Sequence, residues 1–276
     1  MCVLEGFSFL FPFTKRNDKP ETVPEKLTEK INYKIFFVIV IGLLTYQFYL
    51  YSFLNSDDPH LKLVVTITTT LTALVTSIAG FVISKRYWRS SVFGISYLAL
   101  ALGMLCNALA ERIYYFLDQQ GQVPSPSIAD LVWLSFYPLV FYHLTKNIRF
   151  FKPKIRLPVK MMVALIPMII TGVYAFLEYG QEQSVDTTFF LGLAYVAGSS
   201  IILSAAILGA IVFRQGTLGT PWLILTLGLV LTALGDNWYA YLDVYNQYTY
   251  LHPLNLLWYG GYLVIVYALF KHKKVL

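Results

Sequence analysis

Eight long apolar stretches, separated by short polar loops, constrain the fold of this 276-residue chain more than any other feature. Each is long enough to cross the hydrocarbon core of a bilayer, which takes about 20 helical residues. We place them at residues 35–54, 61–84, 92–117, 128–148, 158–177, 187–213, 220–242 and 253–270. Because a backbone inside a bilayer must satisfy its own hydrogen bonds, we expect these stretches to be helices. The sequence therefore predicts an all-α, polytopic membrane protein.

The composition excludes several other classes of protein. Hydrophobic residues make up 57% of the chain and charged residues only 13%, whereas a soluble domain carries about 25% charged residues. An ordinary soluble enzyme, a disordered chain and a fibrous protein are therefore excluded. Cys2 and Cys106 lie far apart in the sequence, which excludes a disulfide framework and a zinc cluster built from cysteines.

The charges predict how the chain is oriented in the membrane. Of the 21 Lys and Arg residues, all but Lys62 and Arg112 lie at the two termini or in the loops after the second, fourth and sixth stretches. The alternate loops are acidic. By the positive-inside rule, both termini are cytoplasmic in the cell membrane. The net charge of +6 then reflects loops that face the anionic lipid bilayer and predicts no nucleic-acid partner.

An internal repeat emerges when the chain is compared with itself at a shift of 125 residues. Polar and aromatic residues match in one register, namely Glu111, Tyr114, Asp130 and Trp133 with Asp236, Tyr239, Asn255 and Trp258. Each repeat holds four spans, an even number, so both repeats enter the membrane in the same sense. The sequence thus predicts two parallel four-helix repeats, related by an axis along the membrane normal.

The repeat also divides the chain into segments. The N-terminal segment is expected to be cytoplasmic, and Thr22 and Glu25 resemble a capping box that opens a short interfacial helix there. Glu5 and Pro12 interrupt its early apolar run, which argues against a signal peptide. The predicted units are the N-terminal segment, the first repeat, the second repeat and a cytoplasmic tail, at residues 1–34, 35–150, 151–271 and 272–276.

Two acidic residues inside the predicted spans need an explanation, because an unpaired acid in a membrane costs a few kcal/mol or more. Glu111 and Asp236 occupy equivalent positions in the outer halves of the third and seventh spans. Helical spacing places Tyr114 and Asn107 on the same helix face as Glu111, and Tyr239 on the same face as Asp236. We therefore predict an outward-facing polar cavity between the repeats, lined by Glu111, Tyr114, Asp236, Tyr239, Asp130, Asn255, Trp133, Trp258 and Asn107.

A structural alternative stands beside this prediction. The same polar side chains can form interhelical hydrogen bonds that hold the two halves together. For Asp130, which opens the fourth span, the alternative is a helix cap whose carboxylate meets free backbone N–H groups. Arg112, the basic residue next to Glu111, is a candidate to neutralise one of the acids.

The run PSPSIADLVWLSFYP, residues 124–138, resembles part of a multispan input region. Such regions precede diguanylate cyclase or histidine kinase domains in many prokaryotic signalling proteins, where a P-S-x-A-D segment, an aromatic residue and then Y-P open a helix. The second half of the chain is similar to the later helices of such regions, at Gly235, Asp236, Trp258 and Tyr262. The resemblance implies a membrane sensor that acts through a cytoplasmic or membrane signalling partner, although this sequence contains no output domain.

Several function classes stay open. Besides a sensory or ligand-binding module, Glu111 and Asp236 are compatible with a proton- or cation-coupled transporter or channel. They are also compatible with an intramembrane lipid hydrolase, distantly similar to eight-helix lysoplasmalogenase-type enzymes, in which they act as general acid and base. A structural subunit of a membrane complex is a further alternative. No metal-hydrolase or nucleotide-binding motif occurs, and the sequence assigns no catalytic residue, cofactor or oligomeric state.

Overall fold

The computed structural model describes residues 31–55, 58–121, 124–151, 154–213 and 219–275. Every predicted apolar stretch forms a helix in it, which confirms the all-α fold class. The helices are α1 Tyr33–Phe53, α2 Pro59–Arg86, α3 Phe93–Gln119, α4 Ile128–Phe150, α5 Leu157–Glu182, α6 Thr187–Phe213, α7 Gly219–Val244 and α8 Asn255–Val275. The interfacial helix expected near Thr22 lies outside the described residues.

Seven of these helices, α1 to α7, are long and apolar enough to cross a membrane. The protein is therefore an integral multispan membrane protein. The sequence predicts eight spans, but α8 is not among the seven helices of the described chain that meet this test. Its lower apolarity has a visible cause, because α8 contains Asn255, adjacent glycines, three tyrosines and a lysine-rich last turn.

Polar side chains fix where two of the helices begin. Asp58 precedes α2, where its Oδ1 accepts the His60 N–H at 2.8 Å and Pro59 supplies the first helical residue. At the start of α4, Ser127 and Asp130 form a capping box, in which Asp130 Oδ2 accepts the Ser127 N–H at 2.7 Å. The capping role predicted for Asp130 is thereby confirmed.

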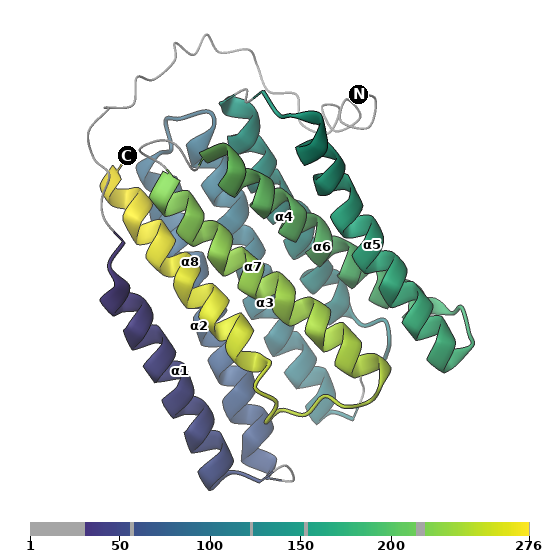
Figure 1. Cartoon of the computed structure of the whole chain (residues 1–276). Helices are drawn as coiled ribbons and strands as arrows, with labels where there is room; N and C mark the ends of the chain where they lie inside the picture. The colour runs from purple at the N-terminus through teal and green to yellow at the C-terminus, as the bar shows by residue number, and fades with distance from the viewer. Residues whose placement is uncertain (1–30, 56–57, 122–123, 152–153, 214–218, 276) are drawn as a thin grey trace.

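Six helices form the core of the bundle, and two lie at its margins. The core helices are α2, α3, α4, α6, α7 and α8, in which α2 packs on α3 and α8, and α4 packs on α3 and α6. The marginal helix α1 packs on α8, whereas α5 packs on α6 and α7, and the two lie on opposite sides of the bundle (Figure 1). Most of the apolar surface of α1 and α5 is thus available to lipid.

The bundle has two ends of opposite charge. The acidic end holds the loops α1–α2, α3–α4, α5–α6 and α7–α8 (Figure 1), with Asp58, Asp118, Glu178, Glu182, Asp186 and Asp243 at or near it. At the other end α1 begins and α8 ends. We name it the basic end because it carries Lys34, Lys85, Arg86, Arg89, Lys146, Arg149, Lys154, Arg156, Lys160 and Lys271. Lys62 stands apart, since it lies in the first turns of α2 at the acidic end.

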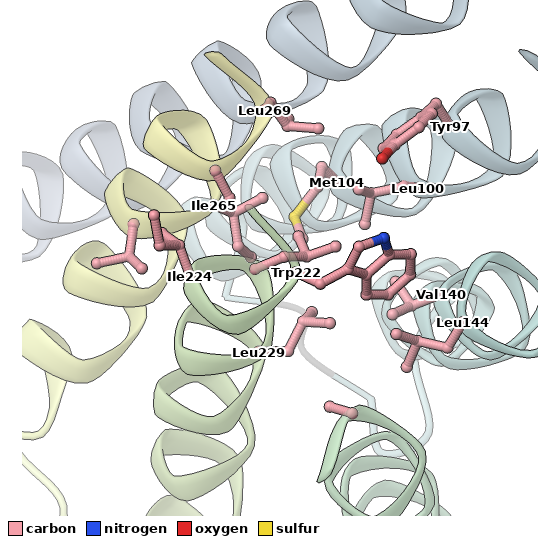
Figure 2. Packing of buried hydrophobic residues seen from close by; sticks show 14 of the residues in the cluster. Tyr97, Leu100, Met104, Val140, Leu144, Trp222, Ile224, Leu229, Ile265 and Leu269 are labelled. Atoms are coloured by element: carbon pink, nitrogen blue, oxygen red, sulfur yellow. The ribbon is translucent and has the colours of Figure 1, made fainter. Parts of the chain in front are cut away.

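The core is packed around the indole of Trp222 on α7. Figure 2 shows this ring lying among Leu100 and Met104 of α3 and Val140 and Leu144 of α4, all fully buried. A single aromatic residue thus fills the space between three helices, and its neighbours come from both predicted repeats.

Helices α7 and α8 approach each other closely at two glycines. A Cβ added to Gly228 would lie 2.5 Å from Ile265 Cγ1, and one added to Gly261 would lie 2.6 Å from Thr232 Oγ1. Neither position has room for a side chain, so the small residues set the distance between the two helices.

Candidate functional site

Asp236 on α7 is held by both of its carboxylate oxygens. Its Oδ1 accepts the indole N–H of Trp258 from α8 at 2.8 Å, and its Oδ2 accepts the hydroxyl of Tyr137 from α4 at 3.2 Å. The predicted residues Asp236 and Trp258 are thus brought together. Tyr137 was not predicted, although it lies one residue before Pro138 in the run that carries the family resemblance. Asp236 therefore joins three helices from both halves of the chain.

Glu111 on α3, the repeat equivalent of Asp236, has a different environment. It is half-buried, and none of the hydrogen bonds or ion pairs among the described residues involves its carboxylate. Arg112 interacts with it electrostatically, but the Arg112 Nε–H donates to Thr70 Oγ1 at 3.1 Å. Four tyrosines lie within electrostatic range of Glu111, namely Tyr248, Tyr250, Tyr259 and Tyr262. Glu111 thus interacts electrostatically with Arg112 and with four phenols, and has no hydrogen bond among the described residues.

Tyr262 on α8 connects the surroundings of the two acids. Its phenol lies within electrostatic range of both Glu111 and Asp236. Its oxygen accepts a hydrogen bond from Asn107 Nδ2 at 3.2 Å, which places the predicted residue Asn107 beside it. Within the described residues no hydrogen bond joins Glu111 to Asp236, and the buried Tyr262 interacts electrostatically with both.

The aromatic residues predicted for the site form two matching pairs. The rings of Tyr114 and Trp133 lie 5.5 Å apart at an angle of 48°. Their repeat equivalents, Tyr239 and Trp258, lie 5.9 Å apart at the same angle of 48°. Each pair joins two consecutive helices, α3 with α4 and α7 with α8.

Asn255 and Asp130 hold other residues in position. The Asn255 Oδ1 accepts the hydroxyl of Tyr248 at 3.0 Å, and its Nδ2 donates to the Tyr250 carbonyl at 2.9 Å. It therefore fastens the α7–α8 loop to the start of α8. Asp130, besides its capping bonds, accepts the hydroxyl of Tyr195 from α6 at 2.8 Å.

Lys62 is the residue of this region that the sequence analysis noted only as an exception. Its ammonium group forms an ion pair with Asp118 at the end of α3. It also lies 5.7 Å from the ring centroid of Tyr114 and 5.5 Å from that of Tyr250, within the range of a cation–π contact. The signal in the sequence was its charge, because a lone lysine at the acidic end breaks the positive-inside pattern.

The lysine lies between two strings of aromatic rings. On one side are Tyr114 and Trp133. On the other side ring centroids follow one another at 5.9 Å, 4.9 Å and 5.9 Å through Tyr250, Tyr248, Tyr239 and Trp258. Burial, with Asp118 and Glu111 nearby, raises the pKa of the Tyr250 phenol to about 12, so this ring stays neutral at physiological pH. We call Lys62, Tyr114, Asp118, Tyr250 and Glu111 the lysine cage.

A second cluster of polar aromatic residues lies toward the basic end. Four rings follow one another in a closed cycle, in which Tyr97 meets His143 at 5.0 Å, His143 meets Trp222 at 5.7 Å, Trp222 meets His272 at 6.0 Å, and His272 meets Tyr97 at 5.5 Å. All four side chains are fully buried. The sequence predicts a tail that starts at residue 272, whereas the structure continues α8 to Val275 and buries the His272 imidazole.

Hydrogen bonds fix part of this cluster. His143 Nδ1 lies 3.0 Å from the Ser96 carbonyl oxygen, which can only accept, so Nδ1 carries the proton. The Tyr97 hydroxyl lies 2.8 Å from His272 Nδ1. Four buried polar atoms in and beside this cluster have no hydrogen-bond partner within the described chain, namely His143 Nε2, Asn147 Oδ1, Trp222 Nε1 and His272 Nε2.

The interior next to Asp236 is narrow. A crevice between α4, α6 and α7 is lined mainly by apolar side chains and has no room for a water molecule; its lining is Phe136, Tyr137, Ser199, Ile202, Leu229, Thr232, Ala233 and Asp236. The described residues contain no group of three or more His, Cys, Asp or Glu that could hold a metal ion.

Comparison with known proteins identifies no family. No family model, curated protein or solved structure matches the chain. The resemblance of residues 124–138 to a sensor input region therefore stays a prediction, and the function has to be argued from the geometry.

Proposed function

We propose that the protein is a sensory, ligand-binding membrane module whose site lies around Glu111 at the acidic end. The observation that carries this proposal is the contrast between the two acids. Asp236 has a donor for each oxygen, whereas Glu111 has none among the described residues. An acidic residue inside a membrane protein without a partner is expensive, and such a cost is typical of a group reserved for a ligand.

The proposal includes an orientation. We infer that α8 is an eighth crossing, because its 21 residues span about 30 Å and it packs along α7 and α2. Eight crossings place both termini on one side of the membrane. The many lysines and arginines of the basic end make that side the cytoplasm, so the lysine cage and Glu111 face outward.

Matching contacts support the proposed parallel repeat. Helix α2 packs on α8 as α6 packs on α4, which are equivalent pairs between the halves. A Cβ on Gly103 would meet Val140 at 3.2 Å, and a Cβ on its equivalent Gly228 would meet Ile265, the equivalent of Val140, at 2.5 Å. The marginal helices differ, since α1 packs on the other half and α5 on its own.

On this arrangement the acid of the second repeat has a structural role and the acid of the first repeat a binding role. In the second half Asp236 bonds Tyr137 and Trp258. The first-half equivalents of this triad are Glu111, Tyr262 and Trp133. There Tyr262 accepts a hydrogen bond from Asn107, and Glu111 is left open. We infer that the Asp236 triad holds the two halves together and that the Glu111 side receives the ligand.

The closed basic end favours binding over transport. The cycle of Tyr97, His143, Trp222 and His272 fills the interior there with fully buried rings, and the crevice beside Asp236 admits no water. A transporter needs a route past these residues, whereas a sensor needs only an outer site. The resemblance of residues 124–138 supports a separate signalling partner, which we place at the basic end.

Two charge-neutralising variants test the proposal. Glu111→Gln removes a charge that has the electrostatic attraction of Arg112 but no hydrogen bond or ion pair among the described residues. We therefore expect the variant to be more stable by about 1 kcal/mol or more and to melt at a higher temperature. Asp236→Asn replaces one of the two acceptor oxygens by an NH₂ group, so only one of the donors Tyr137 and Trp258 keeps its acceptor. We expect this change to lower stability by about 1–3 kcal/mol. Glu182→Gln, at an exposed position, is the matched control and should leave the stability and the melting temperature unchanged.

The measurement is thermal unfolding of the three variants in one detergent. Opposite shifts for Glu111→Gln and Asp236→Asn support the division into a binding acid and a structural acid. If both variants lose stability alike, the two acids are structural, and the proposed site is lost.

A further inference from the structure

The lysine cage holds one cation that belongs to the chain itself. Lys62 reaches from the first turns of α2 to Asp118 and to the faces of Tyr114 and Tyr250. Such a combination of a carboxylate and aromatic faces is what binds ammonium ions in proteins, because the negative face of the ring attracts a cation. The cage is therefore occupied by a tethered ammonium group.

The two carboxylates of the cage differ in how they are paired. Lys62 neutralises Asp118, but Glu111, two turns deeper on the same face of α3, has no ion-pair partner within the described residues. Tyr250 lies within electrostatic range of both carboxylates. Asp118 is thus paired with Lys62, whereas Glu111 has only the electrostatic interaction with Arg112, whose Nε–H is directed to Thr70.

The chemistry of the enclosure selects the kind of cation. Ca²⁺ and Mg²⁺ need several oxygen ligands, and the described residues offer no group of three carboxylate, His or Cys side chains. The walls are phenol rings, which favour a weakly hydrated, polarisable ammonium ion. The neutral state of Tyr250, whose pKa is about 12, keeps its ring available for this contact.

We propose that the site binds a small organic ammonium ion, and that Lys62 occupies its place in the unliganded protein. The inference rests on the proposed function, because it names the ligand class of the Glu111 site. Binding would move the Lys62 ammonium away from Asp118, and the incoming cation would lie between Tyr114 and Tyr250 with Glu111 beneath it.

The hydrogen bonds of Asn255 explain how this exchange would reach the rest of the bundle. Tyr250 belongs to the α7–α8 loop, and Asn255, the first residue of α8, bonds both the Tyr250 carbonyl and the Tyr248 hydroxyl. A ligand that displaces the Tyr250 ring therefore acts directly on the start of α8.

The test uses tetramethylammonium chloride as the probe and the full chain in lipid nanodiscs, with binding measured by calorimetry against equal sodium chloride. Lys62→Met keeps the aliphatic stem and removes the competing charge, so we expect about tenfold tighter binding than in the wild type. Lys62→Gln is a second variant in case the first folds poorly. Lys160→Met, an exposed lysine of the basic end, is the control and should leave the affinity unchanged.

Variants of the walls complete the test. Tyr114→Leu and Tyr250→Leu each remove one aromatic face and should weaken binding about three- to tenfold, whereas Tyr179→Leu, at an exposed position of the acidic end, should not. Nanodiscs of phosphatidylglycerol are compared with nanodiscs that contain phosphatidylcholine. Competition by phosphatidylcholine would identify a lipid headgroup as the natural source of the ammonium ion, and its absence a free solute; both results uphold the ligand class.

Two results would overturn the inference. One is folded Lys62→Met or Lys62→Gln protein that binds tetramethylammonium no more tightly than the wild type. The other is the absence of binding in every variant. If Glu111→Gln nevertheless stabilises the protein, the site stands and its ligand belongs to another class, whereas loss of stability in that variant removes the proposed function as well.

Discussion

The indole of Trp222 lies parallel to the imidazole of His143, with ring centroids 5.7 Å apart and an angle of 14° between the planes. Trp222 comes from α7 and His143 from α4, so this stack joins the two halves of the chain. Trp222 also stacks on Phe213, with ring centroids 4.3 Å apart. The contact is the centre of the packing near the basic end.

Replacement of Trp222 by leucine is expected to destabilise the protein by about 3 kcal/mol or more, because a fully buried ring is exchanged for a smaller side chain and a cavity remains. Unfolding of the purified protein in mild detergent gives the measurement. Trp88, which is 64% exposed, provides the control, and Trp88→Leu should change stability by less than about 0.5 kcal/mol. Equal effects of the two variants would contradict the central role of Trp222.

The hydrogen bond between Tyr97 and His272 leads to a second prediction. Tyr97→Phe keeps the ring and removes the hydroxyl that lies 2.8 Å from His272 Nδ1. We expect a loss of about 1 kcal/mol and faster hydrogen exchange in the last turns of α8. Tyr179→Phe, at a 54% exposed position, is the matched variant. Unchanged exchange in α8 would mean that the bond does not hold its end.

Glycine positions give a third prediction. Gly228→Ala would place a Cβ 2.5 Å from Ile265 and 2.8 Å from the Gly261 carbonyl oxygen, so α7 and α8 would have to separate. We expect a loss of about 2 kcal/mol or more, read from the melting temperature. Gly172→Ala in α5, with no atom within 4 Å of the new Cβ, should be neutral or slightly stabilising, since alanine favours a helix. A harmless Gly228→Ala would refute the close approach.

The pH dependence of the α7–α8 loop is a fourth prediction. Burial lowers the pKa of His252 below its ordinary value, and its Nδ1 accepts the Leu254 N–H at 3.1 Å. Because the folded-state pKa is the lower one, the unfolded chain binds more protons in mild acid. The contribution of His252 is thus complete above about pH 6.5 and is lost as the pH falls toward the folded-state pKa.

Melting temperatures of the wild type and of His252→Gln between pH 5 and pH 7.5 check this prediction. The wild type should lose more stability on acidification than the variant. His60→Gln serves as the control, because the His60 side chain is exposed, and its profile should follow the wild type. Parallel profiles for all three proteins would show that His252 does not contribute.

Hydropathy alone predicted where all eight helices lie, because the apolar length that a bilayer requires is written directly in the sequence. The cap at Asp130 was also predictable, since Ser127 and Asp130 have the spacing of a local motif. Neither inference depends on how distant parts of the chain meet.

The rest depends on tertiary packing. The sequence around His272, between Lys271 and Lys273, is typical of a basic tail, and only the packing of α8 against Tyr97 on α3 buries the imidazole. Lys62 was visible as an exceptional charge, but its role requires α2, the end of α3 and Tyr250 to be placed together.

The difference between Glu111 and Asp236 was equally hidden. The two residues occupy equivalent positions in the predicted repeat and are chemically alike. Their partners differ because Tyr262 accepts a hydrogen bond from Asn107, while Tyr137 donates to Asp236. A self-comparison of the sequence predicts equivalent positions for the two acids but not the partners that each acid has in the structure.

Helix α8 touches both regions described above. Its first residue, Asn255, is hydrogen-bonded to the carbonyl oxygen of Tyr250 in the α7–α8 loop. Its last turns carry His272, which contacts Tyr97 and Trp222 in the ring cycle. Because α8 is one continuous helix, a displacement of its first turn moves its last turn as well. A shift of the first residue of α8 would therefore change the position of the His272 imidazole at the other end of the same helix.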